Sequence, residues 1–241
     1  MKPRASVLWF PGTNCHHEML RAFELAGAQA SLVLLNTLLE DRGRLTDTDL
    51  VGIPGGFSFG DHFGAGRVAA YDLTQRLSDQ LLELQQRHVP ILGICNGFQI
   101  LVASGLLPGD GPVGIPTAVM DLNETARFEH QYATCVFLHD DPQTSCVWTK
   151  GLDGVLVYMP SAHGEGRPYT QAPVSRVVGT YGSYQGSDQY PDSPNGSSIA
   201  GMCDPSGAIA GFMPHPERRT ERHLGGGDGL QIFQAGVRSV T

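Results

Sequence analysis

The sequence predicts an α/β fold: a three-layer, mostly parallel, doubly wound sheet with helices on both faces and added antiparallel strands. In the first half of the chain, short apolar runs alternate with segments of helical spacing, which is typical of parallel strands joined by crossover helices. In the second half, strand-like segments follow one another between turns rich in Gly, Pro, Asn and Asp, which indicates antiparallel strands. We expect one domain that spans residues 1–241.

The first half supplies the predicted parallel strands and most of the helices. Apolar runs bounded by turn residues predict the strands, and apolar residues that recur every three or four positions predict the helices. The strands are expected at 5–10, 30–35, 49–53 and 89–94, and the helices at 18–27, about 66–87 and after 95. The long helix is predicted from one apolar face, formed by Val68, Leu73, Leu77, Leu81 and Leu84.

The second half supplies the predicted antiparallel strands and one further helix. The strands are expected at 131–138, 154–159, 174–180, 197–202 and 208–213, and the helix near 228–237. The polar, turn-rich stretch 181–194 is predicted to be a surface loop. We expect these strands to extend the same sheet rather than to form a second domain.

Composition excludes several classes of function. The net charge of −8, from 16 basic and 24 acidic residues, argues against a nucleic-acid or anionic-membrane surface. The five cysteines are odd in number and form no CxxC pair, so neither a disulfide framework nor a zinc site is indicated. No run of about 18 apolar residues and no signal-peptide core is present. We expect a cytoplasmic location. The basic cluster 218–223 is either a docking patch or an ordinary solvated face.

Cys95 is the predicted nucleophile. It lies in GICNGFQ at 93–99, where a buried strand ends and a helix begins, and this arrangement is a nucleophile elbow. Gly93 and Gly97 leave room for the tight turn and for close helix packing. A helix N-terminus next to the sulfur favours the thiolate. The alternative is that Cys95 is a small buried apolar residue, as many single cysteines are.

His215 is the predicted base, and Glu217 is predicted to orient it. In MPHPE at 213–217 the two side chains are two residues apart, and residues at that spacing share one side of an extended segment. The alternative is a proline-rich turn with both side chains exposed. The rival histidines His163, His16 and His17 are expected in loops that face solvent. No HExxH motif is present, and we expect no metal site.

The glycine-rich segment IPGGFSFGDHFGAG at 53–66 is the predicted oxyanion loop. Glycines allow backbone N–H groups to turn toward a developing negative charge. Gly55 and Gly56, with the N–H of Asn96, are the expected donors. A phosphate-binding loop is the competing interpretation, but neither GxxxxGK[ST] nor GxGxxG occurs as a strand-to-helix motif.

These three motifs together resemble those of the class I glutamine amidotransferases, in which a Cys-His-Glu triad hydrolyses glutamine. Further stretches resemble the glutaminase subunits of phosphoribosylformylglycinamidine synthase along the whole chain: PGTNC at 11–15, GGFSFGDHFGAGRVA at 55–69, NETARFEH at 123–130, AHGEGR at 162–167 and the segment 190–218. Related amidotransferases that make GMP, CTP or carbamoyl phosphate usually have GGPG in the oxyanion loop, without FSFGD, which makes the resemblance specific.

The resemblance implies a role for each matching residue. Cys95 would form a γ-glutamyl thioester, His215 would carry the proton to the departing ammonia, and Glu217 would orient His215. The pocket for the oxyanion and for glutamine would be lined by Gly55, Gly56 and Phe57, with Gln99 in support and with Arg127 and Phe128 against the amino-acid end of glutamine. Phe98 departs from some relatives, which have cysteine or another side chain there, and we expect an effect on packing only.

The resemblance also implies the partners. The free-standing form of the family works with a large synthetase subunit and a small accessory subunit, and it supplies ammonia for the conversion of formylglycinamide ribonucleotide to formylglycinamidine ribonucleotide. ATP and magnesium would then belong to the synthetase, and this chain would need no cofactor. Two alternatives stay open: a stand-alone hydrolase of the DJ-1/PfpI type, which lacks the HPE segment, and a non-catalytic regulatory subunit, in which a triad residue would be expected to be lost.

Overall fold

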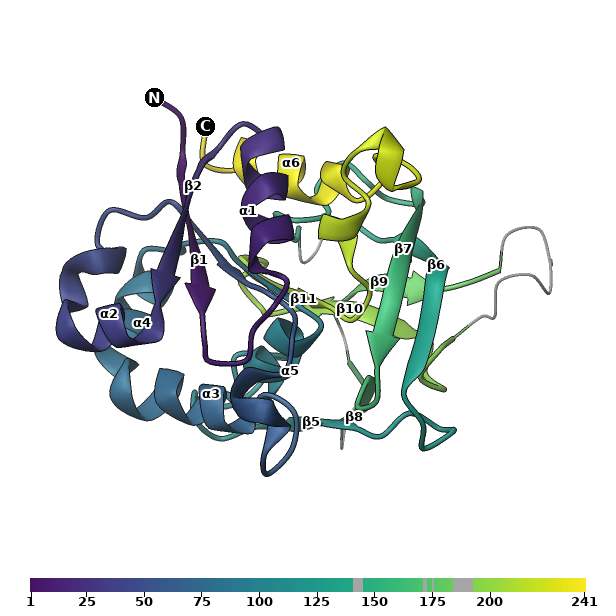
Figure 1. Ribbon diagram of the computed structural model, residues 1–241, viewed down its shortest axis with the longest axis horizontal. Helices are drawn as coiled ribbons and strands as arrows, with labels where there is room; N and C mark the ends of the chain where they lie inside the picture. The colour runs from purple at the N-terminus through teal and green to yellow at the C-terminus, as the bar shows by residue number, and fades with distance from the viewer. Residues whose placement is uncertain (141–144, 171–172, 175, 184–192) are drawn as a thin grey trace.

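A nine-stranded sheet forms the centre of the computed structural model, which describes residues 1–140, 145–170, 173–174, 176–183 and 193–241 (Figure 1). The strand order is β2-β1-β3-β4-β11-β10-β9-β6-β7. Neighbouring strands from β2 to β11 pair in parallel, and those from β11 to β7 pair antiparallel. The strands are β1 (Arg4–Trp9), β2 (Gln29–Leu34), β3 (Leu50–Ile53), β4 (Ile91–Ile94), β6 (Glu129–Leu138), β7 (Leu156–His163), β9 (Val177–Tyr181), β10 (Ile199–Cys203) and β11 (Ile209–Phe212). The predicted fold class is confirmed.

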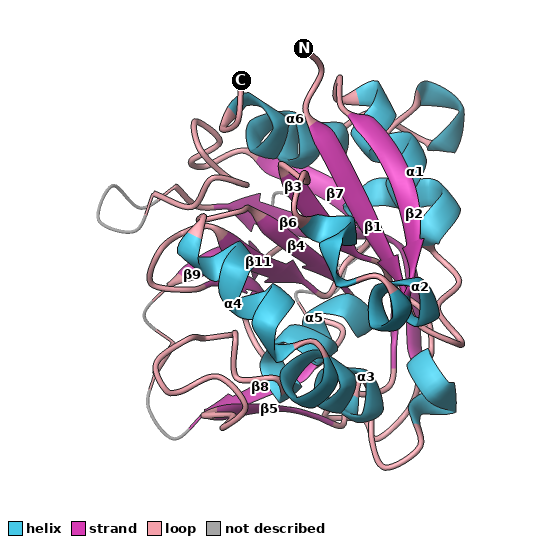
Figure 2. Ribbon diagram, turned by 90° about the vertical axis from the view of Figure 1, so that its left-hand side faces the viewer, coloured by secondary structure: helices cyan, strands magenta, loops and turns pink. Residues whose placement is uncertain are grey.

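Helices cover both faces of the sheet (Figures 1 and 2). On one face α1 (His16–Leu25) packs beside α6 (Leu230–Arg238), and their contact includes an edge-to-face pair of Phe23 and Phe233, with ring centroids 5.1 Å apart. On the other face lie α3 (Arg67–Tyr71), α4 (Ser78–Gln86) and α5 (Asn96–Ala103). The short α2 (Leu35–Glu40) follows β2 and was not predicted.

The parallel strands bring the predicted motifs together at one edge of the sheet. The oxyanion loop follows β3, Cys95 follows β4, and the MPHPE segment follows β11. Because β3, β4 and β11 are adjacent and parallel, their carboxyl ends meet at the same edge, which is where open α/β sheets bind ligands.

The predicted long helix at 66–87 is wrong in one respect, because the structure divides it into three parts. Between α3 and α4 lies a π-helical turn at Asp72–Arg76, in which the N–H of Leu77 donates to the carbonyl of Asp72 at 3.0 Å. Val68 is only half-buried. In a regular α-helix, residues five apart, such as Val68 and Leu73, do not lie on the same face. The wider π turn places Leu73 and the later leucines on the buried face.

The strand predicted at 154–159 is longer in the structure. β7 continues through Pro160 to His163, and proline is tolerated there because β7 is the edge strand of the sheet. A second, two-stranded sheet of β5 (Ala118–Asp121) and β8 (Arg167–Thr170) was not predicted, since both strands are short and Pro168 lies in one of them. Most of the predicted loop, residues 184–192, lies outside the described residues.

In the part of the chain that the structure describes, no helix is long and apolar enough to cross a membrane.

The close packing of α5 against the end of β3 leads to a prediction about stability. A Cβ atom at Gly97 would lie 1.9 Å from the carbonyl oxygen of Ile53. Helix propensity alone favours alanine over glycine by about 1 kcal/mol, but this clash requires the backbone to move. We therefore expect Gly97→Ala to lower the free energy of unfolding by about 1–3 kcal/mol, measured by chemical denaturation.

Gly227→Ala is the matched control, because a Cβ atom there has its nearest neighbour at 3.8 Å. We expect its denaturation midpoint to match that of the wild type. A Gly97→Ala variant as stable as the control would contradict the proposed close packing of α5 against the end of β3.

Candidate active site

Cys95 occupies a strained corner between β4 and α5. Its backbone angles are φ 52° and ψ −107°, a region that non-glycine residues enter at a cost of about 1–3 kcal/mol. The Cys95 N–H donates to the carbonyl of Phe212 on β11 at 2.7 Å, which holds the corner against the neighbouring strand. The side chain is buried apart from 6% of its surface, and its sulfur lies 3.6 Å from the carbonyl oxygen of Ala162. The predicted elbow geometry is present.

His215 and Glu217 form a buried pair next to this corner. The Nδ1 atom of His215 lies 2.6 Å from Oε1 of Glu217, and both residues are almost fully buried. The backbone N–H of His215 donates to the carbonyl of Pro160 at 2.7 Å, so the proline in β7 helps to fix the backbone of the histidine. The pairing is as predicted, but its backbone cause differs: the segment Pro216–Arg218 is a 3₁₀ turn and not an extended strand.

The pKa of His215 is raised well above its ordinary value. Burial alone lowers the pKa, but the charge of Glu217, followed by that of Cys95, outweighs burial. The protonated imidazolium is therefore favoured between the Glu217 carboxylate and the Cys95 sulfur. This arrangement suits a group that holds a proton for a leaving group and takes one back from water.

Gly55 allows the oxyanion loop to lie against both side chains. A Cβ atom at this position would be 2.8 Å from Cε1 of His215 and 3.3 Å from Cβ of Cys95, so a larger residue would displace the histidine. Gly56 follows at φ 145°, a conformation that favours glycine. The N–H of Phe57 donates to the carbonyl of Gly12 at 3.1 Å. Phe57 therefore contributes its ring to the site, and its N–H is already used.

Asn96 and Gln99 tie three segments together beneath the site. The side-chain oxygen of Asn96 accepts from the N–H of Ser58 at 3.0 Å, and its amide nitrogen donates to Gln99 Oε1 at 3.0 Å. Gln99 in turn donates to the carbonyl of Glu165 at 2.6 Å. The oxyanion loop, α5 and the loop after β7 are thus held in one network.

A cavity of about 150 Å³ opens onto Cys95. It is lined by Gly56, Phe57, Asp61, Ala65, Cys95, Gln99, Leu122, Phe128, Ala162, His163, Gly164 and Glu165. The rings of Phe57 and Phe128 both line it and are tilted by 31° to one another, with centroids 6.4 Å apart. The structure thus brings the predicted Phe128 to the cavity, whereas Arg127 is exposed and does not line it.

Known glutamine amidotransferases resemble this chain in sequence. Residues 2–225 match the family model of the CobB/CobQ-like glutamine amidotransferase domain. The chain is 40% identical to phosphoribosylformylglycinamidine synthase subunit PurQ of Treponema denticola, over 90% of this chain and 88% of that protein. It is 39% identical to the subunit of the same name from Pyrococcus furiosus, over 98% of this chain and 97% of that protein.

The chain belongs to the PurQ family of glutamine amidotransferases. The resemblance inferred from the motifs is confirmed. A solved structure of PurLQS from Thermotoga maritima contains a chain with 32% identity and a TM-score of 0.79, and the match covers 100% of both chains. A putative GMP synthase subunit from Thermoplasma acidophilum, at 15% identity and a TM-score of 0.57, shares the fold.

Two acidic residues of this PurQ-family chain line the cavity and were not predicted. The side chain of Asp61 accepts a hydrogen bond from Asn96 at 3.0 Å. Burial is the main cause that raises the pKa of Asp61, and the charge of nearby Glu165 adds to it; together they outweigh the hydrogen bonds, which lower the pKa. Glu165 accepts from the N–H of Ala65 at 3.1 Å. Asp61 has a positive φ of 52°, and a non-glycine residue in that conformation gives no sequence signal.

His163 was predicted to face solvent, and that prediction is wrong. It is 98% buried at the end of β7 and lines the cavity, with Nδ1 2.9 Å from Oδ1 of Asn123. Burial, together with the charge of His215, lowers its pKa to about 4. The ring of His163 is therefore neutral next to the charged ring of His215. His16 and His17 lie at the start of α1 and not in a loop, with His17 exposed.

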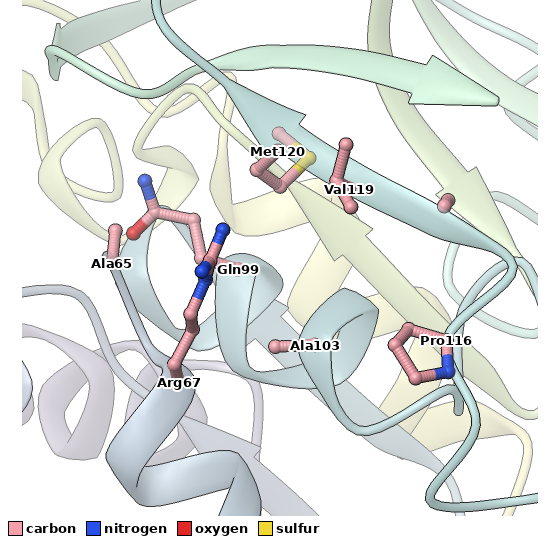
Figure 3. A pocket seen from close by; sticks show the side chains of 8 residues that line it. Ala65, Arg67, Gln99, Ala103, Pro116, Val119 and Met120 are labelled. Atoms are coloured by element: carbon pink, nitrogen blue, oxygen red, sulfur yellow. The ribbon is translucent and has the colours of Figure 1, made fainter. Parts of the chain in front are cut away.

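A larger cavity of about 340 Å³ adjoins the first one (Figure 3). It is lined by Ala65, Arg67, Gln99, Ala103, Pro116, Ala118, Val119 and Met120, so Ala65 and Gln99 belong to both cavities. Figure 3 shows the side chains of Arg67 and Gln99 at one end and Pro116 at the other. The unpredicted strand β5 forms its far wall.

Most side chains of the basic cluster 218–223 contact other residues of this chain. Arg218 donates to the sulfur of Cys15 at 2.8 Å, Arg219 is buried with its guanidinium 5.8 Å from the ring centre of Tyr132, and Glu221 pairs with Arg21. Only Arg222 and His223 of this segment are exposed. A docking patch formed by the whole cluster is therefore not supported.

The buried His215–Glu217 pair generates a prediction about proton affinity. Replacing the carboxylate in Glu217→Gln removes the negative charge that raises the pKa of His215 most. Burial, which lowers this pKa, is then opposed less, and we expect the pKa to fall. The measurement is an NMR titration of the histidine Cε1–H signals. Glu221→Gln removes a surface carboxylate that pairs with Arg21, and we expect it to leave the His215 titration unchanged. An unaltered His215 pKa in Glu217→Gln would contradict the assigned cause.

Proposed function

We propose that this chain hydrolyses L-glutamine to glutamate and ammonia in the cytoplasm. The ammonia passes to a partner synthetase that converts formylglycinamide ribonucleotide to formylglycinamidine ribonucleotide in purine biosynthesis. The observation that carries the proposal is Cys95 at a strained elbow next to His215, whose ring Glu217 holds at 2.6 Å. The relatives named as phosphoribosylformylglycinamidine synthase subunits support the choice of pathway.

The first half-reaction forms a thioester. The Cys95 sulfur attacks the side-chain amide carbon of glutamine, and the carbonyl π electrons move to oxygen. The N–H groups of Gly55, Gly56 and Asn96 are the proposed donors to the developing oxyanion, and one such donor is worth about 10²–10³ in rate. When the carbonyl reforms, the C–N bond breaks, and His215 gives its proton to the departing nitrogen, which leaves as ammonia.

The second half-reaction releases glutamate. The imidazole of His215, now neutral, takes a proton from water as the water oxygen attacks the thioester carbon. The C–S bond then breaks, and the thiolate of Cys95 and the imidazolium of His215 are restored. Glu217 is a positioning residue: it holds Nδ1 so that Nε2 faces the sulfur, and its charge supports the imidazolium in both steps.

The cavity suits the amino-acid end of glutamine. The carboxyl groups of Asp61 and Glu165 present negative charge to an α-ammonium group, and the rings of Phe57 and Phe128 offer an apolar surface to the aliphatic part of the substrate. Gln99 supports the floor of the cavity through its bond to the Glu165 carbonyl. We assign no substrate contact to Arg127, because its side chain lies outside the cavity lining.

Membership of the PurQ family supports a proposal about the partner subunits. A PurQ-family chain that matches over its full length occurs in a structure named PurLQS, which supports a complex with a large synthetase subunit and a small accessory subunit. ATP and magnesium then belong to the synthetase, and this chain needs no cofactor for the steps described above.

The proposal predicts a separation of two activities in the assembled complex. Cys95→Ala removes the nucleophile, so we expect glutamine-dependent product formation to fall by at least about 10³-fold. Product formation from added ammonium salt should remain, because the synthetase site is untouched. The measurement is the formation of the amidine product with each nitrogen source, after gel filtration has verified the complex.

Cys135→Ala is the matched control, since it also truncates a buried thiol but lies in β6, away from the elbow. We expect it to retain both activities. Undiminished glutamine-dependent activity in Cys95→Ala would overturn the mechanism. Glutamine-dependent activity that is absent from the wild-type complex, with ammonia-dependent activity present, would favour the non-catalytic subunit.

A further inference from the structure

We propose that Cys15, His215 and Glu217 form a zinc site, and that zinc bound there reversibly takes His215 out of use. The binding itself stands on geometry, while the inhibition rests on the proposed glutamine hydrolysis. Cys15 has no part in that reaction, although it is buried beside the histidine. We therefore assign Cys15 a role other than glutamine hydrolysis.

The three side chains offer a donor set that zinc prefers. One ligand atom from each residue lies within 4.8 Å of the others, and all three residues are buried. Zinc binds thiolate, imidazole and carboxylate, and its tetrahedral ligand atoms stand roughly 3.4–3.6 Å apart. Binding therefore requires side-chain rotations that bring these ligand atoms closer together. Three protein ligands leave the fourth position for water.

The carboxylate supplies a second and independent observation. Oε1 of Glu217 pairs with His215, but Oε2 is buried and has no hydrogen-bond partner among the described residues. Glu217 is 1% exposed, and a buried carboxylate oxygen without a partner is costly. A cation bound to Oε2 would satisfy that oxygen.

The surroundings of Cys15 favour zinc over harder cations. Its sulfur accepts a hydrogen bond from Nη2 of Arg218 at 2.8 Å, and the thiolate is the form of a cysteine that binds metal. Two protons leave when the metal binds: the thiol proton, which points to Oδ1 of Asn14 at 3.1 Å, and one ring proton of His215, because zinc binds the neutral imidazole. The positive charge of Arg218 opposes any cation, and only a thiophilic ion gains enough from the sulfur to offset it.

Zinc at this site and catalysis exclude one another. Zinc on Nε2 blocks the nitrogen that exchanges a proton with Cys95, and zinc on Nδ1 displaces the Glu217 carboxylate that orients the ring. The group of three contains Cys15 and not Cys95. The nucleophile is therefore dispensable for metal binding, which separates this site from simple capture of a metal by an active-site thiol.

The test measures zinc and cobalt binding to the full-length, chelator-treated chain in the absence of glutamine. Competition with a chromogenic chelator gives the affinity and stoichiometry, and Co²⁺ gives a thiolate charge-transfer band. We expect one Zn²⁺ per chain, a loss of affinity of at least about 10–100-fold in Cys15→Ala, and loss of the Co²⁺ band in that variant. Cys15→Ser provides a second variant should the alanine variant fail to fold.

Cys95→Ala and Cys203→Ala are the controls. Both should keep the wild-type zinc affinity and the Co²⁺ band. In the wild-type complex, zinc should abolish glutamine-dependent activity, and a chelator should restore it. Wild-type protein without a stoichiometric zinc site, or binding that depends on Cys95 and not on Cys15, would overturn the proposal. A chain that binds zinc as predicted but never hydrolyses glutamine contradicts the proposed function alone.

Discussion

The close contact between α5 and the end of β3 is the constraint on which the site depends. Gly97 lets the helix approach the Ile53 carbonyl, and this approach turns the chain sharply enough to leave Cys95 at φ 52°. The strained corner directs the thiol out of the sheet and places the start of α5 behind it.

The adjacency of β3, β4 and β11 converts three distant sequence motifs into one site. Each motif follows a parallel strand, so the register of the sheet sets their separation. The edge strand β7 adds a fourth element, because its extension past Pro160 fixes the His215 backbone and carries Ala162 and His163 to the cavity. Neutral His163 and charged His215 then share one buried region, with opposite shifts in pKa that follow from their different partners.

Much of this arrangement was predictable from the sequence, because local patterns encode it. The elbow at Cys95, the His215–Glu217 pairing and the strand and helix alternation all depend on residues close together in the chain. The contacts of Asp61, His163 and Cys15 depend on segments far apart, and no local pattern marks them. The π turn at Asp72–Arg76 escaped prediction because side-chain periodicity tolerates one inserted residue, and β7 was cut short because Pro160 normally ends a strand.

The most direct test of the account is peptide-mapped mass spectrometry after exposure to an electrophilic glutamine analogue, with the chain alone and in complex with its synthetase partners. We expect one adduct, on Cys95, that L-glutamine protects against. Because Cys15 is also buried near His215, the map distinguishes the two thiols. An adduct on Cys15 with Cys95 unmodified, or no adduct on Cys95 under either condition, would contradict the assignment of the nucleophile.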